Sequence, residues 1–144
     1  MYFIRLAITL LLIAFPLSSA ANKETSYSLQ LELDSISQPY IQKIEQADGY
    51  RSTLLAYTTY HEFLQGEISD TYEKLQSKLT DSQRIELSSS QQLWGQYLKS
   101  NYDLIQDVWT KQDFGTTSAH DLGQLKSTIL LQRLKILKHY LYSL

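Results

Sequence analysis

Residues 50–79 read YRSTLLAYTTYHEFLQGEISDTYEKLQSKL, and this stretch decides the fold class. At 100° per residue, its recurring apolar and aromatic positions fall within about 80° of arc. These positions are Tyr50, Leu54, Tyr57, His61, Leu64, Ile68, Tyr72, Leu75 and Leu79. A stripe that continues for about eight turns predicts one long amphipathic helix that buries a single face.

A second helix is predicted directly after this stretch. Thr80, Asp81 and Ser82 offer N-cap side chains, and Gln83 stands three residues after Thr80, as in a capping box. One face of the segment then carries Leu87, Gln91, Trp94, Leu98, Tyr102, Ile105 and Trp109, and it is widened by Leu93, Tyr97, Leu104 and Val108. The spacing predicts a second amphipathic helix that meets the first around Trp94.

Residues 111–118, KQDFGTTS, are predicted to form a loop before a last helix. One face of this last segment carries Leu122, Leu125, Ile129, Arg133, Ile136, Leu137 and Tyr140. Three long amphipathic helices with short connections predict an all-α fold, an antiparallel bundle that occupies residues 49–144.

Residues 21–48 carry two conflicting patterns. Tyr27, Leu29, Leu31 and Leu33 alternate with polar residues, which is typical of a strand, whereas Ile36, Tyr40, Ile41 and Ile44 have helical spacing. Pro39 suits the first turn of a helix. We expect a short N-terminal arm, irregular or helical, that ends at the Asp48–Gly49 break.

The first 20 residues have the layout of a signal peptide. Arg5 precedes an apolar run over residues 6–15, Pro16 ends the run, and Ser18 and Ala20 supply small residues for cleavage. The run is shorter than the roughly 20 residues that span a bilayer. The alternative is a buried N-terminal helix. We expect a mature chain that begins at Ala21 or Asn22, is periplasmic or secreted, and has no membrane span.

The composition narrows the function classes. The chain has 144 residues, enough for one domain, and its 13 Lys and Arg against 15 Asp and Glu argue against a general nucleic-acid binder. It has no cysteine, which excludes disulfides, cysteine-based zinc sites and thiol nucleophiles. No phosphate-binding loop, nucleophile elbow or HExxH motif occurs. The sequence therefore predicts a protein that is not an enzyme and uses no cofactor and no metal.

Two polar residues lie within apolar stripes. His61 has no second ligand one turn away, so we expect a core or boundary histidine bonded to a hydroxyl, with a base or metal ligand as the alternative. Arg133 needs a partner if it is buried, and Gln91, Asn101 and the ring of Trp94 face it. We expect a polar clamp between the last two helices, with a binding role as the alternative.

The second half of the chain resembles the lysozyme-inhibitor LprI-like family of small secreted bacterial proteins. Residues 68–75, ISDTYEKL, match a family segment built around a tyrosine and a leucine. The further matches are Leu79, Leu87, Gln91, Trp94, Tyr97, the glycine-containing loop at residues 115–117, Ile129, Arg133 and Leu137. The resemblance covers residues 68–141. Family cysteines are replaced by Tyr102 and Leu125, and Leu98–Lys99 replaces a common Arg–Asp pair.

This resemblance implies an exported cell-envelope binding protein, and some family members inhibit lysozyme. The partner it implies is a lysozyme-type muramidase. The alternative is a structural or assembly module that docks another envelope protein. The candidate contact residues are Phe114, Gly115, Thr116 and Thr117, with Phe114 as an apolar anchor. Alternatively, Phe114 packs back onto the bundle and the loop is a plain connector.

Overall fold

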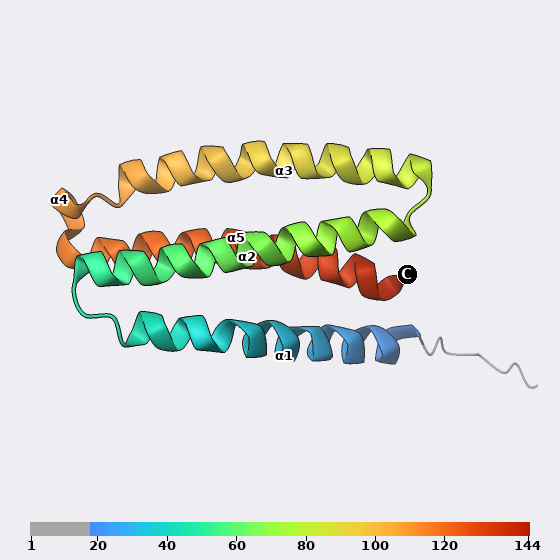
Figure 1. Cartoon of the computed structure of the whole chain (residues 1–144), viewed down its shortest axis with the longest axis horizontal. Helices are drawn as coiled ribbons and strands as arrows, with labels where there is room; N and C mark the ends of the chain where they lie inside the picture. Colours follow the sequence, from blue (N-terminus) through green and yellow to red (C-terminus); the bar gives the residue numbers. More distant parts are fainter. Residues whose placement is uncertain (1–17) are drawn as a thin grey trace, which may run out of the picture.

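The computed structural model describes residues 18–144, and this part of the chain is helical with no strand. Its long helices are α1 (Ser18–Glu45), α2 (Tyr50–Lys78), α3 (Asp81–Val108) and α5 (Ser118–Ser143). The short α4 (Lys111–Phe114) and a 3₁₀ turn, η1 (Gly115–Thr117), connect α3 to α5. Consecutive long helices run in opposite directions, so α2 and α5 run the same way (Figure 1). The predicted all-α bundle is confirmed, whereas most of the predicted signal peptide lies outside the described residues.

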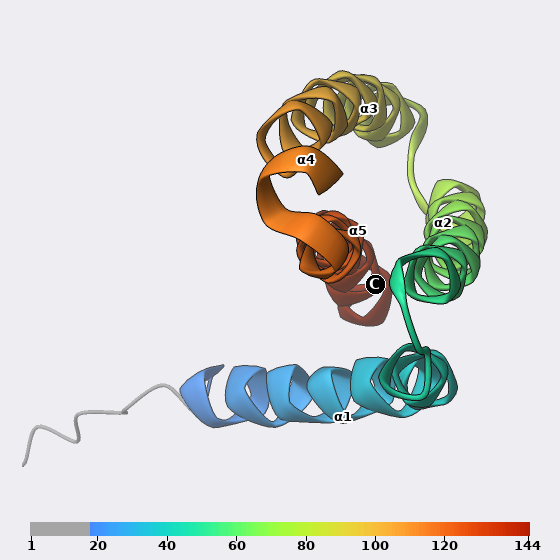
Figure 2. The same cartoon turned by 90° about the vertical axis from the view of Figure 1, so that its left-hand side faces the viewer.

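The N-terminal arm is helical, which confirms the helical alternative, but it is a long helix and not the short arm that we expected. α1 has 28 residues, contains Pro39 and is inclined to the other long helices (Figure 2). Leu29 and Leu33 are buried, but Leu31 is 52% exposed, so alternate residues do not share a face. Positions four apart share the buried face of a helix, and this spacing accounts for the apparent strand pattern.

The closest packing in the bundle joins α2 to α5. A side chain at Gly123 of α5 would overlap the ring of Tyr57 of α2, because that ring lies directly against the backbone. Farther along the pair, Leu64 and Leu75 of α2 are fully buried with Leu130, Leu134 and Leu137 of α5. These leucines form the centre of the core. Trp94, the predicted meeting point, is only partly buried and packs against the edge of this cluster.

α1 is attached to this pair by a polar cluster and by aromatic stacking. Lys138 Nζ lies 2.8 Å from Glu32 Oε1 and 3.6 Å from Glu67 Oε2, and the Tyr142 hydroxyl donates to Glu32 Oε2 at 2.7 Å. Although burial opposes it, the bond to Glu32 raises the pKa of Lys138. The Tyr40 ring stacks 4.4 Å from that of Phe63. The ion pairs and the stacked rings hold α1 across α2 and α5.

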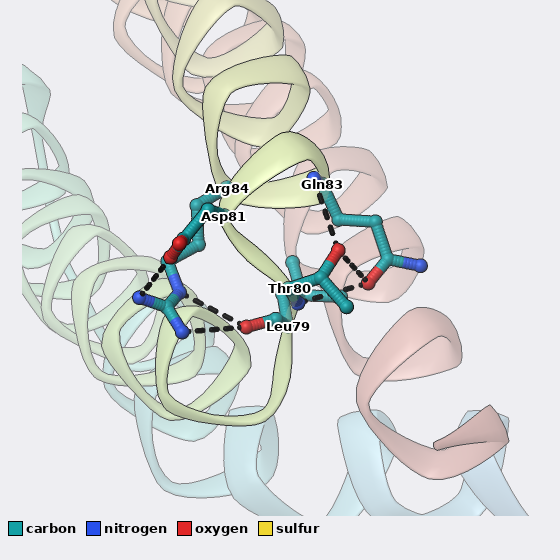
Figure 3. Close-up of polar contacts among 5 residues, drawn as sticks. All are labelled: Leu79, Thr80, Asp81, Gln83 and Arg84. Carbon is teal, nitrogen blue, oxygen red and sulfur yellow. Dashed lines mark hydrogen bonds and ion pairs between the residues drawn. The ribbon is translucent and has the colours of Figure 1, made fainter.

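The start of α3 is fixed by the capping box that the sequence predicts. The Thr80 side chain accepts from the backbone N–H of Gln83, and the Gln83 side chain accepts from the Thr80 N–H at 3.0 Å (Figure 3). Arg84 donates from Nε and Nη2 to the Leu79 carbonyl at 3.0 and 2.8 Å and pairs with Asp81 at 3.1 Å. These contacts set the direction in which the chain leaves α2.

The segment predicted as a loop at residues 111–118 is mostly helical. Thr110 caps α4 by accepting from the Asp113 N–H at 3.2 Å, and Gly115, with φ +63°, ends this single helical turn. The positive φ at Gly115 is a conformation that glycine adopts without strain. Local hydrogen bonds therefore give the connection between α3 and α5 a helical structure. The residue types of this segment, which are common in turns, did not indicate that structure.

The close approach at Gly123 yields a stability prediction. We expect Gly123→Ala to lower the free energy of unfolding by about 1–3 kcal/mol, because the added methyl group must displace the Tyr57 ring or separate the helices. The matched control is Gly95→Ala in the interior of α3, where an added Cβ meets no atom within 4 Å. It should raise stability by about 0.5–1 kcal/mol. Chemical denaturation measures both, and equal effects would contradict the close packing.

Candidate functional site: the outer face of α3 and the adjoining pocket

The outer flank of α3 presents an apolar strip to solvent. We call this strip the α3 face, and it consists of Leu93, Tyr97, Leu104 and Val108, which are 63%, 52%, 60% and 42% exposed. From the sequence we expected these residues to widen the packed face of the helix, and their exposure shows that this expectation is wrong for them. They remain exposed because α3 packs mainly against α5 and buries only a narrow line of residues. A contiguous exposed apolar patch marks a binding surface more often than an isolated exposed leucine does.

The charges of α3 are mostly negative. The helix carries four carboxylates against two cations. Arg84 pairs with Asp81 at 3.1 Å, and Lys99 pairs with Asp103 at 2.7 Å. Glu86 and Asp107 make no ion pair within the described part of the chain. The α3 face therefore lies on a helix of net charge −2, which favours the approach of a cationic partner.

The predicted contact residues Phe114, Gly115, Thr116 and Thr117 are exposed at the end of the bundle. The ring of Phe114 is 46% exposed, and its centroid lies 6.3 Å from that of Trp109, with the planes 26° apart. Thr117 Oγ1 donates to the Phe114 carbonyl at 2.8 Å. Phe114 thus packs on Trp109 and remains accessible, whereas the hydroxyl of Thr117 is used to close the turn.

A pocket of about 350 Å³ lies between the start of α2, the end of α3, α4 and the start of α5. Trp109, Tyr50 and Tyr57 contribute aromatic surface, and Lys111 and Lys126 contribute charge. Because Trp109 stacks on Phe114, this pocket adjoins the predicted contact residues. The sequence did not indicate the pocket, since its walls combine the start of α2 with residues 106–126, a segment much later in the chain.

His61 is a boundary histidine bonded to a hydroxyl, as predicted. Its Nε2 lies 3.0 Å from Ser127 Oγ and 3.1 Å from the carbonyl oxygen of Gly123. Because a carbonyl only accepts, Nε2 carries a proton. Ser127 Oγ donates its own hydrogen to the Gly123 carbonyl at 2.8 Å. Nε2 is therefore not placed to remove a proton from Ser127, and this pair does not form an activated nucleophile.

Burial lowers the pKa of His61, which keeps the ring neutral at physiological pH. The Tyr57 hydroxyl lies 3.1 Å from His120 Nδ1, so a second histidine is also engaged by a hydroxyl. Among the described residues, no three His, Asp or Glu side chains are grouped in a way that could hold a metal ion. These contacts join α2 to α5 and have a structural role.

Arg133 forms the predicted clamp, with one correction. Its Nε and Nη2 donate to Gln91 Oε1 at 3.0 and 2.7 Å, Nη1 donates to Ser90 Oγ at 3.3 Å, and the guanidinium carbon lies 5.6 Å from the Trp94 ring. Asn101 is not a partner, because its Nδ2 donates to the Tyr97 carbonyl within α3 at 2.8 Å. Ser90 takes the place that the sequence assigned to Asn101.

Comparisons with protein-family models, with curated proteins and with solved structures find no match to this chain. Within residues 18–144, none of the helices has both the length and the apolarity needed to cross a membrane.

The clamp leads to a test of how α3 is held. We expect Arg133→Ala to lower the free energy of unfolding by about 2 kcal/mol, because it leaves the Gln91 side chain without its donor. In a double-mutant cycle with Gln91→Ala, the two changes should be coupled by about 1 kcal/mol or more. Asn101→Ala serves as the control and should show no coupling to Arg133. Additive effects of Arg133→Ala and Gln91→Ala would contradict the clamp.

Proposed function

We propose that this protein is an exported, non-enzymatic binding protein of the bacterial cell envelope that inhibits a lysozyme-type muramidase. The observation that carries this proposal is the α3 face, with Leu93, Tyr97, Leu104 and Val108 exposed along one helix. A soluble, monomeric chain rarely exposes such a strip unless a partner covers it. Phe114, at the end of α4, is 46% exposed and offers a further apolar contact.

The charge on α3 supports a muramidase as the partner. Lysozymes are commonly cationic, and a helix of net charge −2 would attract such an enzyme. Steering of this kind raises the association rate more than the affinity, and it weakens at physiological salt. The affinity would come from a few apolar anchors that become fully buried, as in other protein interfaces.

The resemblance to the LprI-like family supplies the activity in this proposal. Its matching residues include Gln91, Trp94 and Arg133, which form the clamp that positions α3. The residues that match the family would therefore hold α3 against α5, and the exposed residues of α3 would contact the lysozyme. In this account the inhibitor blocks the enzyme's cleft and performs no chemistry of its own.

The test is the lysis of bacterial cell walls by several classes of lysozyme, followed by turbidity. The wild-type chain should inhibit at least one class with a micromolar or lower inhibition constant. Leu104→Ser and Phe114→Ala should each weaken the inhibition by about tenfold or more, because each removes an apolar anchor. Circular dichroism should show that both variants keep their helicity.

Leu55→Ser on α2 is the matched control, because Leu55 is 67% exposed and lies outside the α3 face. This variant should inhibit as the wild type does. Full lysis with every class in the presence of excess folded protein would refute the inhibitor proposal. Capture of a lysozyme without inhibition would favour the docking module instead.

A further inference from the structure

The pocket between α2, α3, α4 and α5 has a charge opposite to that of the chain. The chain as a whole has a net charge of −2. The residues that line the pocket include Lys111, Lys126 and the imidazole of His61, but no Asp or Glu. Two cationic side chains in one pocket of an acidic protein produce a local positive potential, which favours the binding of an anion.

Neither lysine uses its charge in an ion pair within the described part of the chain. Lys111 Nζ lies 4.9 Å from the centre of the Tyr50 ring, and Lys126 Nζ lies 4.6 Å from that of Tyr102. These cation–π contacts hold the ammonium groups over aromatic faces and leave N–H donors for a further partner.

Two of the carboxylates around these lysines already have partners. Asp103, whose charge acts on Lys126, forms its ion pair with Lys99 at 2.7 Å. Asp113 accepts a hydrogen bond from the side chain of Thr110. Burial lowers the pKa of Lys126, which means that its charge is incompletely compensated. A bound anion would provide that compensation.

The remaining walls suit a flat organic group. Trp109, Tyr50 and Tyr57 are aromatic, Leu54 and Leu122 are aliphatic, and the volume of about 350 Å³ is at the lower end of ligand pockets. We propose that this pocket binds a small organic carboxylate, whose ring packs on these side chains while its carboxylate meets Lys111 and Lys126. This site is separate from the α3 face.

Phenylacetate is a suitable probe, and phenylacetamide is its neutral counterpart. In ¹⁵N spectra of the purified chain, the indole N–H signal of Trp109 reports on the pocket. The chain has two tryptophans, so the Trp94→Phe variant shows which of the two indole signals belongs to Trp109. Phenylacetate should shift this signal with saturation and a millimolar or lower dissociation constant. Phenylacetamide should bind about tenfold more weakly, because it lacks the charge.

Variants of the two lysines test whether their charges bind the carboxylate of the ligand. Lys126→Gln and Lys111→Gln should each weaken phenylacetate binding by about fivefold or more, and Lys126→Arg should retain it. Lys74→Gln on the exposed surface of α2 is the control and should bind as the wild type does. The melting temperature of each variant separates lost binding from lost folding.

Three results would overturn the proposal. They are a Trp109 signal that does not shift, equal binding of phenylacetamide and phenylacetate, and unchanged binding in both glutamine variants. Inorganic phosphate that binds as tightly as phenylacetate would overturn the assignment of a ring-bearing ligand. None of these results depends on lysozyme inhibition, so the pocket and the α3 face are tested separately.

Discussion

Because Gly123 has no side chain, the ring of Tyr57 lies directly against the backbone of α5. This contact sets the distance between α2 and α5, and the bond from His61 to the Gly123 carbonyl fixes their register. The fully buried leucines follow along the same two helices, including Leu64, Leu130 and Leu137. The other helices are added to this pair: α1 through Lys138 and the stacked rings, and α3 through Arg133.

The surfaces available for binding follow from this arrangement. The most extensive packing in the bundle joins α2 to α5, whereas α3 has only a narrow line of core contacts. The Arg133 clamp positions α3, and its flank remains exposed as the α3 face. Where α3 ends and the chain turns through α4, four helices enclose the pocket with Lys111 and Lys126. Both proposed sites therefore depend on how α3 is attached.

The sequence predicted those features that depend on residues close together or on strongly amphipathic spacing. The stripe of α2 and the capping box at Thr80 are of this kind. The sequence also indicated Gln91 and Trp94 as partners of Arg133 but not Ser90, and it indicated a hydroxyl for His61 but not which one. The exposure of Leu104 was not predictable, because periodicity gives the direction of a side chain but not the neighbour that covers it. The role of Gly123 depends on Tyr57, 66 residues earlier in the chain, and an isolated helical glycine gives no sign of a close approach. The sequence supplied Phe114 as a contact residue but not the pocket beside it.

Native-state hydrogen exchange tests most directly whether α2 and α5 form the stable centre to which α3 is attached. Amides near Leu64 and Leu134 should exchange only through global unfolding, because they lie among fully buried leucines. Amides in the middle of α3, near Leu93 and Leu104, should exchange through local opening at a lower free energy. Protection in α3 equal to that in α2 and α5 would show that the bundle is uniformly packed, and it would contradict this account.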